Sequence, residues 1–353
     1  MAMLQSNKLN IILDGQFGST GKGLFSGFIA QKERVDVAIT NAAPNAGHTY
    51  VDDDHHIVAH HLPITGILSP TSLIYICAGA IIDPDLLARE LHEYKVPPMR
   101  VVVHPRAAII TKEDVESEKQ KDSSVTKIAS TQHGVGTALA RKILRSGKVA
   151  MDCNALYEMG VQVRELNMDR VLREFPNAVM EVPQGIGLGL NSGLAYPYCT
   201  SREISVAQAM SDAQTHPSRL GNVFMSLRTY PIRVGNIYGL PEEGMLGWSG
   251  PFYPDSKELK WDQLGLEPEL TTVTKRPRRV ATFSHQQFKR AYELARPDYV
   301  FLNFVNYLKS AAELRDLVFQ IVAGRDCRML YGCGPHVDDV LTGIDEVIER
   351  MKW

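Results

Sequence analysis

The chain has 353 residues, of which 44% are hydrophobic and 22% charged; this is an ordinary globular composition, long enough for one large domain or two smaller ones. The formal net charge of -2 excludes a global field that would attract nucleic acid or an anionic membrane, so anion binding must come from local clusters. The five cysteines are scattered without a C-x-x-C pair, and we expect neither disulfides nor zinc, neither secretion nor membrane insertion, and a reduced, cytoplasmic setting.

The predicted elements begin with the usual opening of an α/β nucleotide-binding fold. Lys8–Leu13 reads as an apolar strand, residues 15–23 as a glycine-rich loop and Leu24–Arg34 as a helix. Further strands are expected at Val35–Thr40, Leu73–Cys77, Arg100–Val103, Ala178–Val182, Val300–Phe304 and Cys327–Tyr331. Helices are expected between several of these strands and at the C-terminus, including Ile81–Tyr94, Phe283–Ala295 and His336–Met351. The pattern permits a central, mainly parallel sheet with flanking helices.

The stretch from residue 240 to residue 279 differs from the rest of the chain. It is rich in proline, glycine and charge, and its strand signals are weak. We interpret it as an excursion that carries functional loops, not as a separate domain.

The first motif with a chemical meaning covers residues 14–23, Asp-Gly-Gln-Phe-Gly-Ser-Thr-Gly-Lys-Gly. It is similar to a phosphate-binding loop, because glycines let backbone N–H groups approach phosphate oxygens and Lys22 adds a positive charge. It is not a strict Walker A motif, since the spacing from Gly15 to Gly21 is one residue too long and Gly23 replaces the residue that would hold Mg²⁺. The plainer interpretation is a tight turn between a strand and a helix.

The second motif is Asn-Ala-Gly-His-Thr at residues 45–49, followed by His-His-Leu-Pro-Ile-Thr-Gly-Ile-Leu at residues 60–68. An isolated histidine is usually structural. His48, however, lies in an expected loop between Gly47 and Thr49, close in sequence to the phosphate loop. That position suits a general acid or a group that stabilises developing charge.

These motifs and several later ones resemble the adenylosuccinate synthetase family, whose members open with Q-W-G-D-E-G-K-G, N-A-G-H-T and H-L-x-P-S-G-I-L. The matching segments here are residues 16–23, 45–49, 61–68, 128–136, 181–185, 196–201, 233–235 and 274–279, in the family's order. The resemblance covers nearly the whole chain. It implies a P-loop-like fold of the adenylosuccinate synthetase type in a single domain over residues 1–353. In this family a γ-phosphoryl group moves to O6 of a purine monophosphate, and the amine of aspartate then displaces phosphate from C6.

The resemblance implies a role for each matched residue. Lys22 would hold the transferred phosphoryl group, His48 would stabilise charge at O6, and Ser19 with the Gly47 carbonyl would bind Mg²⁺. The residues around the donor triphosphate would be Gly18, Thr20, Gly21, Lys22, Gly23, Gly47, His48, Thr49, Asn306, Gly334 and Pro335. Those around the acceptor nucleotide would be Ser19, Asn45, Ser130, Thr131, Arg145, Gln184, Thr200 and Arg233.

Two of these implications concern arginines. Arg145 matches an arginine that the family donates from the partner subunit, which implies a homodimer. Thr274, Arg276 and Arg278 match the loop that clamps the carboxylates of aspartate, a task that suits the planar, bidentate guanidinium. Taken alone, this basic run would equally well be a solvated loop or a nucleic-acid patch, and Pro277 interrupts it and alters how the loop closes.

The most informative departure from the family is Ser19, which stands where relatives have an aspartate. That aspartate removes the N1 proton of the purine, and a serine hydroxyl is not a comparable base near neutral pH. One interpretation is an inactive homologue. The other is a changed acceptor, since a smaller residue leaves room for a 2-amino group and its oxygen accepts a hydrogen bond. This pattern resembles the viral branch of the family, the 2-amino-2′-deoxyadenylosuccinate synthetases (PurZ-type), which use dGMP.

A second departure concerns the donor base. Where the family reads guanine with T-K-L-D, this chain has Asn-Phe-Val-Asn at residues 303–306. An asparagine pairs with the donor and acceptor edge of adenine, so Asn306 predicts ATP or dATP over GTP, with Val305 as the competing alignment. Gly334 and Pro335 lie in Gly-Cys-Gly-Pro, which lacks the serine of the family's S-T-G-P loop.

The sequence therefore predicts an Mg²⁺-dependent ligase that joins L-aspartate to dGMP with ATP or dATP. The alternative is an ordinary GTP-dependent adenylosuccinate synthetase acting on IMP. A kinase or NTPase without an amino-acid substrate is disfavoured by the clamp arginines and by residues 45–49. A nucleic-acid-binding protein is disfavoured by the near-zero net charge and by the lack of aromatic residues interleaved with basic ones.

Overall fold

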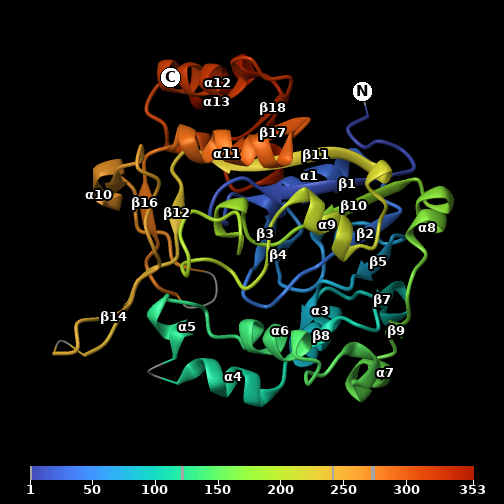
Figure 1. Cartoon of the computed structure of the whole chain (residues 1–353). Coiled ribbons are helices and arrows are strands. Elements are labelled where there is room, and N and C mark those ends of the chain that lie inside the picture. The colour runs from blue at the N-terminus through green and yellow to red at the C-terminus, as the bar shows by residue number, and fades with distance from the viewer. Residues whose placement is uncertain (1, 121–122, 241, 272–274) are drawn as a thin grey trace.

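The computed structural model of the chain describes residues 2–120, 123–240, 242–271 and 275–353. Its centre is a ten-stranded sheet with the order β19-β18-β17-β11-β1-β10-β2-β5-β7-β9 (Figure 1). Among the described residues every pairing in this sheet is parallel except that of β18 with β19. The predicted α/β fold with a mainly parallel sheet is confirmed.

The strands of the central sheet are β1 (Lys8–Asp14), β2 (Val37–Thr40), β5 (Leu73–Ile76), β7 (Val101–Val103), β9 (Gln162–Val163), β10 (Asn177–Glu181), β11 (Leu220–Arg228), β17 (Tyr299–Asn303), β18 (Arg328–Gly332) and β19 (Val340–Leu341). Smaller pairs and sheets are formed by β3 (His48–Val51) with β4 (His56–Ala59), β6 (Ile81–Ile82) with β8 (Ala108–Ile109), β12 (Ile232–Arg233) with β16 (Arg279–Ala281) and β15 (Glu258–Leu259), and β13 (Ile237–Tyr238) with β14 (Met245–Gly247).

The sheet is buried on both faces, as parallel sheets require. On β1, Leu9, Ile11 and Leu13 enter one hydrophobic cluster, while Ile12 between them enters the other. The first face is covered by α8 (Met168–Glu174), α9 (Val206–Asp212), α11 (His285–Ala295), α12 (Ala311–Val322) and α13 (Ile344–Met351). The second is covered by α1 (Lys22–Lys32), α2 (Ile64–Leu68), α3 (Pro84–Glu93) and α7 (Asn154–Glu158).

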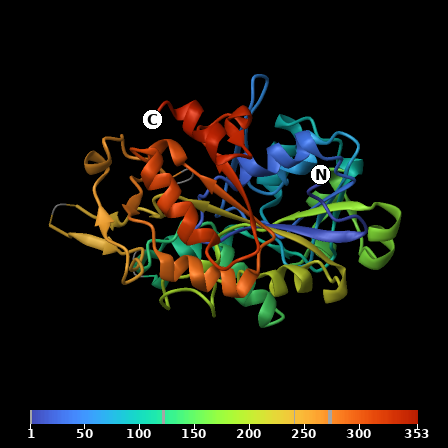
Figure 2. The ribbon, with the colours of Figure 1, turned by 90° about the horizontal axis from the view of Figure 1, so that it is seen from above.

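The remaining helices lie beside this core. α4 (Lys112–Lys119), α5 (Ser124–Lys127) and α6 (Val135–Ile143) gather below the sheet in Figure 1, and α10 (Trp261–Leu264) belongs to the region of residues 240–279. That region contains β14, β15, α10 and the start of β16. The hairpin of β13 and β14 projects from the body of the protein in two perpendicular views (Figures 1 and 2).

Three predicted elements need correction. The C-terminal helix is only α13, because Val340 and Leu341 pair with β18 and a single 3₁₀ turn precedes them. Ile81–Ile82 is a strand, since Asp83 caps the N-terminus of α3 and Pro84 occupies its first position, so the helix begins after them. Helix α1 starts inside the glycine loop, at Lys22. No helix in the described part of the chain is long and apolar enough to cross a membrane.

The order of the strands determines where a ligand site lies. β1 has β10 on one side and β11 on the other, and all three run parallel. In such sheets the crevice outside the carboxyl ends of the strands is where ligands bind. The residues that follow β1, β2, β10, β11 and β17 therefore converge at one edge of the sheet.

Candidate active site

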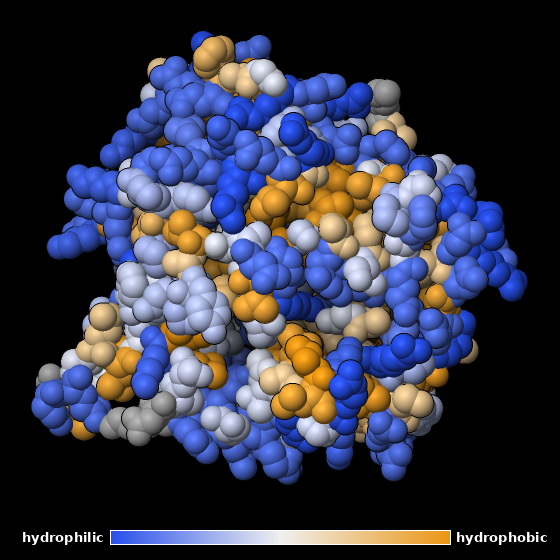
Figure 3. All heavy atoms as spheres, viewed as in Figure 1, coloured by the Kyte–Doolittle hydropathy of each residue, from blue (hydrophilic) through white to orange (hydrophobic). Residues whose placement is uncertain are grey.

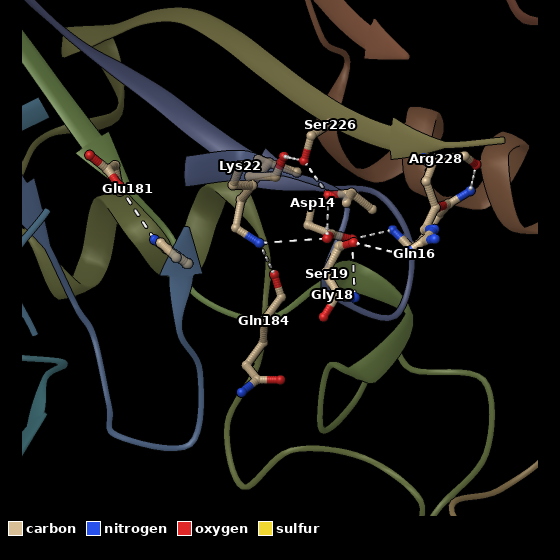
Figure 4. Close-up of polar contacts among 12 residues, drawn as sticks. Asp14, Gln16, Gly18, Ser19, Lys22, Glu181, Gln184, Ser226 and Arg228 are labelled. Atoms are coloured by element: carbon tan, nitrogen blue, oxygen red, sulfur yellow. Dashed lines mark hydrogen bonds and ion pairs between the residues drawn. The ribbon is translucent and has the colours of Figure 1, made fainter. Parts of the chain in front are cut away.

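The phosphate loop is held in shape by the carboxylate of Asp14 at the end of β1. One oxygen accepts the N–H groups of Gln16 at 2.7 Å and Gly18 at 3.3 Å, and the other accepts the hydroxyl of Thr20 at 2.5 Å (Figure 4). Thr20 is fully buried and its hydroxyl also contacts Ser226 at 2.5 Å. Thr20 was predicted to bind triphosphate, but its side chain faces the protein interior, so only its backbone is left for such a contact.

The amine of Lys22 lies beside this carboxylate at the first position of α1. It is 3.5 Å from Asp14 and donates to the carbonyl of Gln184 at 2.8 Å. Burial lowers the pKa of Lys22 below its usual value, and the carboxylate of Asp14 opposes that change. A buried ammonium next to an open cavity is a strong site for a phosphate oxygen, since water does not screen it there.

Two positions in the loop must be glycine, because a side chain there would clash with neighbouring atoms. Gly21 has a φ of 83°, and a Cβ there would lie 1.9 Å from the amide nitrogen of Asn303. A Cβ on Gly23 would lie 2.3 Å from the carbonyl oxygen of Thr49. Gly23 therefore stands where a Walker A motif has Ser or Thr because α1 packs directly against β3.

His48 begins β3 and is oriented by Glu181 at the end of β10. Its Nδ1 lies 3.4 Å from Glu181 Oε2, and Glu181 Oε1 accepts both the N–H and the hydroxyl of Thr65 at 2.8 Å. No described residue bonds to Nε2 of His48. A carboxylate that fixes one ring nitrogen leaves the other to act on a ligand.

Two adjoining cavities meet at these residues. The smaller, of about 90 Å³, brings together members of all three predicted groups, the phosphate loop, the acceptor site and the carboxylate clamp: Gly18, Ser19, Lys22, Asn45, Gly47, His48, Thr131, Gln184 and Arg278. The larger, of about 580 Å³, has the size of a nucleotide-binding pocket and is lined by Asn45, Ser130, Thr131, Gln184, Thr200 and Arg233 among others. Asn45, Thr131 and Gln184 belong to both walls.

The arginines of the clamp reach the site from the region of residues 275–279. Arg278 donates to the hydroxyl of Ser19, and Arg276 donates to the carbonyls of Ala129 at 3.3 Å and Ser130 at 3.4 Å. Burial lowers the pKa of Arg278 to about 10, so it stays charged at neutral pH. Thr274 lies outside the described residues.

Arg233 is one of the residues that line the larger cavity. It donates to the carbonyls of Ser249 at 2.6 Å and Tyr198 at 3.0 Å and lies over the ring of Phe17. Burial lowers its pKa to about 9. These contacts link the loop of residues 196–201 to the phosphate loop.

The remaining residues predicted for the donor base and for the partner subunit line neither cavity. Asn306 is exposed whereas Val305 is buried, so of the two competing alignments only Asn306 can contact a base from solvent. Pro335 is exposed beside half-buried Gly334, and Thr49 is exposed beside the loop. Arg145 is exposed at the end of α6 and lines neither cavity.

Sequence reasoning missed four residues that shape the site: Asp14, Glu181, Arg228 and Glu269. Asp14 and Glu181 lie within or next to the matched motifs, and their positions at strand ends could have identified them. Arg228 is fully buried and forms an ion pair with Glu269. No local pattern marks this pair, because its members are 41 residues apart.

The small cavity offers few protein ligands for Mg²⁺. The described residues include no cluster of three or more His, Cys, Asp or Glu suited to a metal. Ser19 and Gly47 at the small cavity offer neutral oxygens only. Mg²⁺ commonly takes most of its ligands from phosphates and water, so this donor set fits an ion that arrives with a triphosphate.

A phosphate loop, a buried lysine and a carboxylate-oriented histidine at the switch point of a parallel sheet define a nucleotide-dependent phosphoryl-transfer enzyme. The adenylosuccinate synthetase family profile matches residues 11–168 and 154–319. The chain belongs to the adenylosuccinate synthetase family and is a carbon–nitrogen ligase.

Comparison with individual proteins points to one branch. The N6-succino-2-amino-2'-deoxyadenylate synthase of Cyanophage S-2L is 39% identical, over 94% of this chain and 91% of that protein. The protein of the same name from Salmonella phage PMBT28 is 37% identical, over 96% and 98%. The Cyanophage S-2L synthetase bound to dGMP and dATP has a TM-score of 0.86 at 36% identity, covering 98% of this chain and 99% of that one. Adenylosuccinate synthetase from Plasmodium falciparum, at 17% identity and a TM-score of 0.75, shares the fold.

Proposed function

We propose that this enzyme joins L-aspartate to dGMP, with ATP or dATP as the phosphoryl donor, to give 2-amino-2′-deoxy-N6-succinyl-AMP. The observation that carries the proposal is Ser19. It is exposed at the small cavity, where the family has an acidic residue, while Lys22 and His48 are retained beside it. The relatives that match nearly the whole chain have the corresponding activity in their names.

In the first step the γ-phosphoryl group moves to O6 of the base. The bond to the β-phosphate oxygen breaks, a bond to O6 forms, and the N1 proton passes to water, with the Ser19 hydroxyl as the proposed relay. Lys22 and the backbone of the loop would hold the transferred group, and His48 would stabilise the charge that develops on its oxygens. Mg²⁺, which the family uses, would neutralise part of the phosphate charge, with Ser19 and Gly47 as protein ligands.

In the second step the neutral amine of aspartate attacks C6, the C6–O6 bond breaks to release phosphate, and the amine gives up one proton to the departing phosphate. Phosphorylation is needed because an amide-like oxygen is a poor leaving group. Arg276 and Arg278, with Thr274, would clamp the aspartate carboxylates. Arg278 lines the same small cavity as Lys22 and His48, which supports a clamp at the reacting end of the acceptor.

Ser19 would serve the acceptor as a hydrogen-bonding group. Its hydroxyl accepts from Arg278, and a hydroxyl that accepts in this way still has its own hydrogen to donate. The N1 atom of the 6-phosphoryl purine is an acceptor once its proton has left. We therefore propose that Ser19 donates to N1 in the intermediate. Turnover of the Ser19→Ala variant at the wild-type rate would exclude this role.

The acceptor would lie in the larger cavity with its base at Gln184, its sugar near Arg233 and its 5′-phosphate at Thr131 and Thr200. Asn45 and Ser130 would be further contacts to this nucleotide. The donor base would meet Asn306 beside Gly334 and Pro335.

All five cysteines are free, and we place the reaction in the cytoplasm, where its substrates are made.

We also propose a homodimer in which Arg145 reaches the partner's acceptor phosphate. Arg145 lines neither cavity of its own chain and follows Ile143 and Leu144, which are 69% and 75% exposed. Apolar surface lies at the end of α6, in the lower part of Figure 3. A partner subunit would cover it.

The test is to identify the product. The purified protein, given dGMP, aspartate, Mg²⁺ and dATP, should form one adduct whose mass equals dGMP plus aspartate minus water, with an equimolar amount of phosphate. Phosphate release without the adduct would mean an NTPase and would overturn the proposal. A matching reaction without aspartate is the control.

A further inference from the structure

Arg228 ends β11 and is fully buried, yet it lies outside both cavities. Its guanidinium forms a bidentate ion pair with Glu269 and lies 3.8 Å from the ring centre of Phe304. Tyr307 donates to the same carboxylate at 2.9 Å. A buried arginine is costly unless it is paired, and a buried ion pair is by itself weak evidence for a gain in stability.

Arg228 also contacts the phosphate loop, through its backbone and through its side chain (Figure 4). The amide of Gln16 bonds both backbone groups of Arg228, accepting its N–H at 3.0 Å and donating to its carbonyl at 3.1 Å. The guanidinium donates to the carbonyl of Ser19 at 3.2 Å. Ser19 has a φ of 56°, a left-handed conformation that a serine rarely adopts without support. Arg228 supplies that support.

Glu269 extends the network to the carboxylate clamp. Its carbonyl accepts the N–H of Arg278 at 2.8 Å, and the Arg278 side chain donates to the carbonyl of Leu270 at 3.1 Å. Arg278 also donates to the hydroxyl of Ser19. The Glu269 carboxylate opposes the burial that lowers the pKa of Arg278. Ser19 is therefore held through its carbonyl by Arg228 and through its hydroxyl by Arg278, and Glu269 contacts both arginines.

We propose that Arg228 and Glu269 are positioning residues for the second chemical step. Together they set the distance between the clamp arginine, Arg278, and the loop residue beside the base, Ser19. That distance decides whether the amine of a clamped aspartate meets C6. The inference rests on the proposed ligase reaction but not on the identity of its purine. Small displacements of reacting groups cost large factors in rate.

The main test is Arg228→Lys in the full-length protein. Lysine keeps the charge but cannot pair in two places or lie flat on Phe304. We expect the KM for aspartate to rise about 10-fold while the KM values for dGMP and the donor stay within about twofold. We also expect donor consumption to exceed adduct formation, because an intermediate that waits for a misplaced amine is lost to water. In the wild type the two should be equimolar.

A second variant separates positioning from folding. Replacing both members of a buried ion pair by apolar residues is often neutral for stability, so Arg228→Met with Glu269→Leu should unfold near the wild-type temperature. It should still show the aspartate defect and the excess donor consumption. Arg219→Lys is the matched control, because Arg219 precedes β11 at its other end and pairs with Asp169 far from the cavities; it should behave as wild type.

Two outcomes of these measurements would contradict the positioning role. Wild-type aspartate KM and equimolar products in both Arg228 variants would overturn the inference, as would equal losses for all three substrates. If the wild type uses IMP in place of dGMP, the proposed acceptor is wrong. The same comparison made with IMP then still tests the positioning role.

Discussion

The phosphate loop and the carboxylate clamp meet in one small cavity but are built in opposite ways. The turn of the loop is closed locally, since Asp14 bonds Gln16, Gly18 and Thr20 within six residues, and distant Arg228 and Ser226 add contacts to it. The clamp depends on distant partners: Arg276 contacts Ser130, 146 residues away, and Arg278 contacts Ser19, 259 residues away. The bonds that close the loop therefore lie within one segment, whereas the clamp side chains bond to residues from another part of the chain.

The largest loss of activity should come from a change in the phosphate loop. Lys22→Met keeps the apolar stem but removes the charge that would face the transferred phosphoryl group. We expect kcat/KM to fall by about 10³, the scale typical of a lost preorganised charge contact. Phosphate release measures it. Calorimetric binding of dGMP, which should change little, is the control, and a loss below about tenfold would contradict the assigned role.

The clamp should respond through one substrate. Arg278→Lys keeps a cation but not the planar fork, so we expect the KM for aspartate to rise about 10- to 100-fold, with a smaller change in kcat. Steady-state kinetics at saturating dGMP and donor will report it. An unchanged KM for aspartate would mean that Arg278 serves only to hold Ser19.

The dependence of kcat/KM on pH tests how burial and Asp14 together set the pKa of Lys22. Burial lowers its pKa and Asp14 raises it, so Asp14→Asn removes the opposing influence and lowers the pKa further. The protonated amine is the form that binds phosphate. The alkaline fall in kcat/KM should therefore move to lower pH in the variant, and a shift to higher pH would contradict the account. Lys22→Met should show no such limb.

The smallest effect concerns the donor base. Asn306 is exposed and is proposed to read adenine, so Asn306→Asp should improve use of GTP relative to ATP by about 10-fold, the usual value of one base contact. Competition between the two donors gives the ratio directly. The Val305→Ala variant, at the buried neighbour, should leave that ratio unchanged.

The contrast between the two regions also explains what sequence could predict. The strand, glycine loop and helix at residues 8–32 follow from a contiguous pattern, and all six other predicted strands lie in the central sheet. β11 was missed although it borders β1, because Gly221, Asn222 and Ser226 interrupt its apolar run. Arg228 and Glu269 could not be found, since a single charged residue in sequence normally indicates solvent. Only the assembled fold buries Arg228 and brings Glu269 to it.

The cavity residues show the same division. Lys22, His48 and Gln184 were identified because motifs carry them, and they lie together. The contact between Arg278 and Ser19 has no sequence signal, yet it bears on the departure that sets this chain apart from cellular relatives. Arg278 is bonded to the serine that replaces the aspartate, and a hydroxyl that accepts from an arginine still has its own hydrogen to donate, as we propose for Ser19.

The most direct test of the central claim is a competition assay. Equal concentrations of dGMP and IMP are supplied with aspartate, Mg²⁺ and dATP, and the two adducts are quantified by mass spectrometry, so that their ratio gives the ratio of kcat/KM values. We predict that the dGMP adduct dominates in the wild type and that Ser19→Asp shifts the ratio toward the IMP adduct. Dominance of the IMP adduct in the wild type would contradict the account and identify an ordinary adenylosuccinate synthetase.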